Sequence, residues 1–221
     1  MHQNEIKIIE MTFVNAFLIR LNDGFILIDC GLSLFLGKLE QELRSAGCLP
    51  GNLNLVIVTH GDVDHLGNCK ILRDQYKCKI AMHQADTLMA EEGFKPIRTI
   101  KTRKAKIFYY LRRLFRPKIT FDHFKPDFYL CDGQSLKNFG LDATVLHLPG
   151  HTKGSIGILT DDGNFFAGDI LTNRKKPDSA MYIENASDLK NSMDKLKKLP
   201  LKVVYPGHGN PFLWEEIAQL I

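Results

Sequence analysis

The sequence lacks several features that would place it outside ordinary soluble domains. No run of about 18 consecutive apolar residues occurs, so we expect no transmembrane helix. The first ten residues lack a basic stretch followed by an apolar one, the pattern of a secretory signal, and we therefore expect a cytoplasmic location. The five cysteines are odd in number and include no C-x-x-C pair, which argues against a disulfide framework or a structural zinc knot. The net charge of +4 does not by itself indicate a nucleic-acid partner.

Internal repeats, low-complexity tracts and linkers rich in Pro, Gly or Ser are also missing, so we predict a single domain over residues 1–221. Apolar patterning predicts short strands at 5–10, 13–21, 25–29, 53–59, 79–82, 128–130, 143–148, 155–160, 164–167 and 202–205. It predicts helices at 34–46, 68–76, 84–92, 99–115, 187–198 and from about 212 to the end. Two strand-rich halves with helices suggest an α/β or α+β fold in which two sheets pack face to face.

The strongest local signal follows the apolar segment 53–59. Four side chains that can bind metal ions, His60, Asp62, Asp64 and His65, lie within six residues on the loop after this strand. Imidazole and carboxylate groups are the ligands expected for zinc and for harder divalent ions. An ordinary acidic loop is the alternative, in which Asp62 or Asp64 caps the helix that follows.

Three more segments place one such side chain directly after a short apolar strand and beside glycine. They are Pro149-Gly150-His151, Ala167-Gly168-Asp169 and Pro206-Gly207-His208. Glycine allows the backbone to turn sharply and approach closely. A single histidine after a strand does not by itself indicate a metal site. Three such positions together with the His60 cluster favour a metal centre.

This set resembles the motifs of the metallo-β-lactamase superfamily. The first metal motif of that family reads H-x-H-x-D-H and stands here as His60-Gly61-Asp62-Val63-Asp64-His65, while the later motifs match at His151, Asp169 and His208. The resemblance covers nearly the whole chain and implies a four-layer αββα sandwich of two mixed sheets flanked by helices.

The resemblance also implies a mechanism. One metal ion would be bound by His60, Asp62 and His151, the other by Asp64, His65 and His208, and Asp169 would bridge them. A hydroxide shared by the two ions would attack an ester, thioester, lactone or related acyl bond of a small-molecule substrate, with Asp64 helping to move a proton. Similarity in length to the hydroxyacylglutathione hydrolase-like group makes a thioester the first expectation.

Position 62 departs from the family motif, because it is Asp where the family has His. Zinc is the metal expected for a site made mainly of histidines. A carboxylate at position 62 shifts that preference toward iron or manganese. Two other functions therefore stay open: a di-iron redox or oxygen-handling protein of the same fold, and a non-catalytic metal-binding sensor domain.

Asp29 ends the predicted strand 25–29 and resembles an early Asp of the family that orients the metal ligands. Outer carboxylates often accept a hydrogen bond from the second ring nitrogen of a metal-binding histidine. The alternative is an aspartate that forms a turn after a strand.

Residues 95–118 contain ten Lys and Arg residues and no acid, with apolar residues at partly helical spacing. We interpret this segment as a basic amphipathic helical insertion. Its cationic face could be a solvated surface, a lid that attracts an anionic substrate, or a contact with an anionic membrane surface. A nucleic-acid interface has little support, and the oligomeric state is not indicated.

Overall fold

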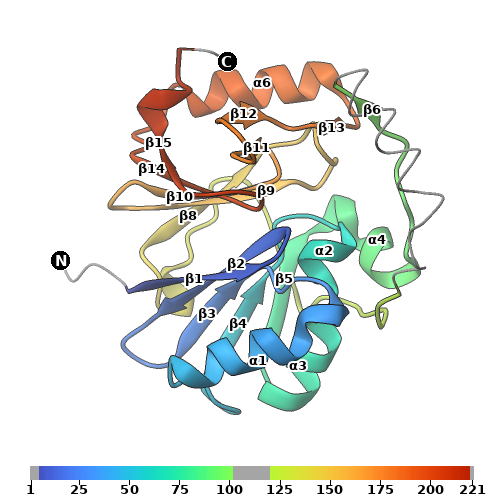
Figure 1. Cartoon of the computed structure of the whole chain (residues 1–221), viewed down its shortest axis with the longest axis vertical. Helices are drawn as coiled ribbons and strands as arrows, with labels where there is room; N and C mark the ends of the chain where they lie inside the picture. The colour runs from blue at the N-terminus through green and yellow to red at the C-terminus, as the bar shows by residue number, and fades with distance from the viewer. Residues whose placement is uncertain (1–4, 102–119, 220–221) are drawn as a thin grey trace.

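The computed structural model describes residues 5–101 and 120–219. Within these residues, two β-sheets lie face to face and helices cover both outer sides (Figure 1). The N-terminal half forms one sheet with its helices, and the C-terminal half forms the other. The predicted four-layer αββα sandwich is confirmed.

The first sheet has the strand order β1-β2-β3-β4-β5-β7. Its strands are β1 (Ile6–Met11), β2 (Val14–Arg20), β3 (Phe25–Ile28), β4 (Leu53–Ile57), β5 (Lys79–His83) and β7 (Phe128–Leu130). The first three run antiparallel, and β3, β4, β5 and β7 are parallel. Helices α1 (Leu36–Ser45) and α3 (Cys69–Tyr76) lie on its outer face (Figure 1).

The central strands of this sheet are largely buried on both faces, which explains why β2, β3 and β5 are mostly apolar. On β2, Phe17 and Ile19 point toward the second sheet, whereas Ala16 and Leu18 belong to the core beneath α1 and α3. Successive side chains of a strand point to opposite faces, so one apolar run supplies both cores.

The second sheet has the order β15-β14-β10-β9-β8. Its strands are β8 (Ala143–His147), β9 (Ile156–Thr160), β10 (Asn164–Gly168), β14 (Val203–Pro206) and β15 (Phe212–Leu213). Helix α6 (Ala186–Leu196) covers its outer face (Figure 1), and Leu189, Met193 and Leu196 pack there. The N-cap of α6 is Asn185, whose side chain accepts hydrogen bonds from the backbone of Ser187 and Asp188.

The interface between the sheets is filled by large side chains. Phe17 of β2 meets Phe166 of β10 with ring centroids 5.2 Å apart, and Tyr205 of β14 stacks on Phe166 at 5.0 Å. This packing fixes the two halves against each other, so ligands presented by both halves can be held at a common edge.

Two predicted helices differ from the structure. The helix predicted over 99–115 is wrong at its start, because β6 (Thr99–Ile100) pairs with β13 (Tyr182–Ile183). Residues 102–115 of that helix, and residues 102–118 of the predicted basic insertion 95–118, lie outside the described part. The helix predicted from about 212 is replaced by β15 and one 3-10 turn, Trp214–Glu216. The partner of β6 lies far along the chain, whereas β15 pairs with β14, the strand just before it. In both places the strand pairing overrides the helical spacing of the apolar residues.

A second short ribbon pairs β11 (Leu171–Thr172) with β12 (Asp178–Ser179). Among the described residues, the other α-helices are α2 (Val63–Leu66) and α4 (Thr87–Glu92), with short 3-10 helices at Ser33–Phe35, Gln84–Asp86 and Lys137–Phe139. No helix in the described ranges is long and apolar enough to cross a membrane.

Candidate metal centre

The four strands that precede the predicted ligands all end at one edge of the sandwich. In the second sheet, β10 and β14 are parallel, and β8 runs in the same direction because both β8 and β10 are antiparallel to β9. Their C-terminal ends therefore lie at one edge, where His151, Asp169 and His208 follow β8, β10 and β14. The loop after β4 brings residues 60–65 to the same place.

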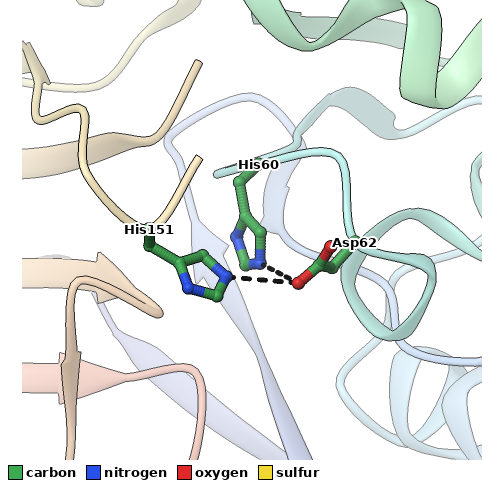
Figure 2. Close-up of side chains that lie close together, drawn as sticks. All are labelled: His60, Asp62 and His151. Carbon is green, nitrogen blue, oxygen red and sulfur yellow. Dashed lines mark hydrogen bonds and ion pairs between the residues drawn. The ribbon is translucent and has the colours of Figure 1, made fainter. Parts of the chain in front are cut away.

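The seven predicted ligands come together in three overlapping groups. They are His60 with Asp62 and His151, His60 with His65 and Asp169, and Asp64 with His65 and His208. In each group the candidate ligand atoms lie within 4.8 Å of one another. Figure 2 shows the first group, in which the carboxylate of Asp62 faces the rings of both histidines.

Asp169 contacts members of more than one group. Its Oδ1 lies 3.3 Å from Nε2 of His65, and its Oδ2 lies 3.2 Å from Nε2 of His208 and 3.8 Å from Nε2 of His151. This is the position that a shared carboxylate between two ions would need.

Each histidine of the cluster is held through Nδ1, which leaves Nε2 for the centre. The Nδ1 of His151 donates to the carbonyl oxygen of Tyr182 at 2.7 Å, and that of His208 donates to the carbonyl oxygen of Phe13. A carbonyl oxygen can only accept, so the proton lies on Nδ1 and the lone pair lies on Nε2.

Asp29 organises the other two histidines. Its fully buried carboxylate accepts hydrogen bonds from the backbone and hydroxyl of Thr59, both at 2.8 Å, and lies 2.7 Å from Nδ1 of His65. Because the Thr59 hydroxyl donates to Asp29, it can accept from Nδ1 of His60, which is 3.1 Å away. Asp29 also has a left-handed backbone with φ 57°, a conformation that non-glycine residues rarely adopt and that aims its side chain under the loop.

Several inward-facing atoms of the described residues make no hydrogen bond. In the described part of the chain, Nε2 of His60, Nε2 of His65 and Oδ1 of Asp169 are buried without a hydrogen bond. Buried polar atoms are nearly always satisfied, so lone pairs that face one another without hydrogen bonds fit the binding of a cation. Imidazole nitrogens and carboxylate oxygens fit a divalent metal ion.

The charges of the cluster agree with a cation site. Burial works to raise the pKa of Asp169, but the neighbouring His208 and His65 outweigh it and hold that pKa well below its usual range. Burial works to lower the pKa of His65, but the carboxylates of Asp29 and Asp169 outweigh it and raise that pKa well above its usual value. Asp169 therefore stays ionised at neutral pH and attracts positive charge into the centre.

Gly207, beside the candidate ligand His208, has no room for a side chain. A Cβ on Gly207 would lie 2.6 Å from Cε1 of His65 and 2.7 Å from Oδ1 of Asp169. A side chain at this position would therefore push the ligands out of place.

The capping alternative for Asp62 is not supported. Asp62 is the N-cap residue of α2, but among the described residues its side chain makes no capping hydrogen bond. Both of its oxygens instead pair with Arg98, at 2.5 and 2.7 Å. The sequence showed Arg98 only as one member of a basic segment.

Asp86 was also missed. Its buried carboxylate accepts hydrogen bonds from the backbone of Gly61 at 2.8 Å, the backbone of Gly154 at 2.7 Å and the hydroxyl of Thr152 at 2.7 Å. It therefore ties the loop of His60 to the loop of His151. Nothing in the sequence around Asp86 signals this role.

An αββα sandwich with a His/Asp metal site at the strand ends defines a class of metal-dependent hydrolases. The chain belongs to the metallo-beta-lactamase superfamily, whose family model matches residues 10–208.

Individual relatives agree with this. The chain is 28% identical over 225 residues to the acyl-coenzyme A thioesterase MBLAC2 of Gallus gallus, covering 93% of this chain and 76% of the relative. It is 29% identical over 138 residues to the hydroxyacylglutathione hydrolase GloC of Haemophilus influenzae, covering 61% and 58%. A metallo-beta-lactamase family protein of Thermus thermophilus has the same fold, with a TM-score of 0.73 at 20% identity and coverage of 98% and 76%.

Proposed function

We propose that this chain is a dinuclear metallo-hydrolase that cleaves acyl thioesters of small molecules. The main support is the convergence of seven ligand-type side chains, with buried inward-facing atoms on His60, His65 and Asp169 that make no hydrogen bond. The thioester class is supported by the names of two relatives, an acyl-coenzyme A thioesterase and a hydroxyacylglutathione hydrolase.

In this proposal the two ions are zinc. His60, Asp62 and His151 would hold one ion, and Asp64, His65 and His208 would hold the other. Asp169 would bridge them, as its distances to His65, His208 and His151 favour. Asp29 would keep His65 in the tautomer that ligates through Nε2.

Two bound divalent ions would supply a Lewis acid for the thioester carbonyl and would lower the pKa of bound water to about 7. The protein residues orient these groups and handle the proton. Asp64 is the most exposed of the three carboxylates, with 32% of its side chain accessible against 23% for Asp62 and 13% for Asp169. It is therefore the carboxylate best placed to pass a proton to the departing thiolate at the solvent side.

The test is hydrolysis of an acyl-coenzyme A and of a hydroxyacylglutathione by metal-loaded protein, followed through release of the free thiol. We expect turnover that is lost in Asp169→Asn and retained in Asp142→Asn. Asp142 is a matched control because its side chain is 72% exposed on the surface. Metal binding without turnover on any ester, thioester or lactone would refute the hydrolase and favour the sensor alternative.

One observation favours a second function, a di-iron redox protein. Asp62 adds a hard oxygen ligand where the family motif has imidazole, and hard ligands suit iron and manganese. Two equivalents of iron per chain with oxygen consumption, and no thiol release, would establish this alternative over the hydrolase.

A further inference from the structure

Asp62 and Arg98 form a close ion pair at the rim of the centre. Nη1 of Arg98 lies 2.5 Å from Oδ2 of Asp62, and Nη2 lies 2.7 Å from Oδ1. The two side chains, of Arg98 and Asp62, are only 12% and 23% exposed. Parallel hydrogen bonds of this kind fix the plane of a carboxylate as well as its charge.

The same carboxylate also faces the candidate ligands. Oδ2 of Asp62 lies 3.2 Å from Nε2 of His151 and 3.5 Å from Nε2 of His60 (Figure 2). Each carboxylate oxygen has two lone-pair sites, and Arg98 takes one on each. Of the two oxygens, Oδ2 is the one whose second lone pair lies near His60 and His151. Asp62 can therefore offer one oxygen atom to an ion between these histidines, as an imidazole offers one nitrogen.

A strand pairing holds the backbone next to Arg98. The following residues, Thr99–Ile100 of β6, pair with Tyr182–Ile183 of β13. The carbonyl oxygen of Tyr182 is the acceptor that orients His151. One two-stranded ribbon (Figure 1) therefore positions both the arginine and a histidine of the same group.

Charge counting explains why an arginine is needed. The three aspartates of the cluster, Asp62, Asp64 and Asp169, give a formal charge of −3, and the four histidines add no charge when they ligate an ion as neutral rings. A histidine at position 62 would give −2, and Arg98 beside Asp62 returns the total to −2. Removing only one member of a buried pair leaves an uncompensated charge.

We propose that Asp62 and Arg98 act as one unit that replaces the histidine of the family motif, with Arg98 as a positioning residue that sets the affinity and metal preference of the His60–Asp62–His151 site. This inference rests on the proposed metal centre. The arginine draws charge from the carboxylate and limits it to one oxygen, so the pair keeps the site selective for zinc. A carboxylate freed from Arg98 would favour manganese or iron.

The test is a two-by-two set of full-length variants: wild type, Asp62→His, Arg98→Gln and the double variant. Metal per chain is measured by elemental analysis, and zinc affinity and zinc-over-manganese preference by competition with a chelator. Arg44→Gln, on the exposed surface, is the matched control for loss of an arginine. Circular dichroism of the metal-free proteins checks that each variant folds.

We expect about two zinc ions per wild-type chain and about one in Asp62→His, because Arg98 would then face the ion without a carboxylate. The double variant should regain the second ion and bind it at least about tenfold more tightly than Asp62→His, a coupling typical of contacting residues. Arg98→Gln should move preference toward manganese, and Arg98→Lys should rescue the charge but only part of the selectivity, because lysine cannot make the paired contact.

Equal zinc binding by Asp62→His and the double variant would overturn the proposal. The proposal would also be overturned if Arg98→Gln kept its metal content and metal preference and showed only a raised KM, because Arg98 would then contact substrate. These outcomes are separate from failure of the proposed activity: wild type with two zinc ions and coupled variants, but without thioesterase turnover, would refute the hydrolase alone.

Discussion

Replacement of Asp86 by Asn should weaken the coupling between the two ligand loops. Oδ2 of Asp86 accepts from Gly61 and Thr152, and Oδ1 accepts from Gly154. An amide has one oxygen, so its NH2 group must face at least one of these donors. The least damaging orientation turns NH2 toward Gly154 and leaves that buried N–H without an acceptor.

The size of the effect follows from these contacts. A buried donor left unsatisfied costs about 1–3 kcal/mol, and the two remaining hydrogen bonds weaken because their acceptor loses its charge. We expect Asp86→Asn to lower the free energy of unfolding by about 2–4 kcal/mol, and Asp86→Ala by somewhat more. Thr152→Val should cost less than either, because it removes only one of the three donors.

Urea denaturation of the metal-free proteins measures this directly, with Asp142→Asn as the surface control. The midpoint should fall while the slope of unfolding free energy against urea stays constant. A change for Asp86→Asn within about 0.5 kcal/mol, the range of ordinary surface substitutions, would refute the assignment of Asp86 as a tie between the loops.

Three further predictions concern the centre and the core. Asp29→Asn should weaken metal affinity about 10–100-fold, because His65 loses the carboxylate that orients it. Chelator competition measures this, and an unchanged affinity would exclude that role for Asp29. Gly207→Ala should fold but lose metal, because the added Cβ would collide with His65. Elemental analysis that finds the full metal content in a folded variant would contradict this prediction. Burial raises the pKa of Cys48 and of Cys78 from 9.0 to about 12, so the folded state holds these protons more tightly than the unfolded state. The contribution of these two thiols to the free energy of unfolding should be complete below about pH 9 and be lost as the pH rises toward 12. Urea titrations across that pH range test this, and the double variant Cys48→Ala/Cys78→Ala should show a flatter decline of stability with pH.

The side chains that meet at the candidate centre could be predicted from the sequence because the pattern that marks them is local. Each of His60, His151, Asp169 and His208 follows shortly after an apolar strand, and strands that run in one direction end at one edge. Apolar runs also revealed the first sheet, since β2 and β3 are almost entirely buried and β4 exposes only Asn54.

The partners of these ligands could not be predicted, because they depend on contacts between distant residues. Arg98 is 36 positions from Asp62, and Asp86 is 66 positions from Thr152. Neither pair has a spacing that a helix or strand would reveal. The error at β6 has the same origin, since this strand exists through β13 elsewhere in the chain. The error at β15 differs, because its partner β14 is the preceding strand.

The most direct test of the dinuclear centre is elemental analysis of purified, untagged protein, per chain, repeated on Asp169→Ala. We expect about two equivalents of zinc in the wild type and loss of metal in the variant, because Asp169 contacts histidines of both proposed sites. Asp142→Ala should retain both ions. Wild-type protein that binds no metal under any reconstitution, or an Asp169→Ala variant with unchanged metal content, would contradict the account.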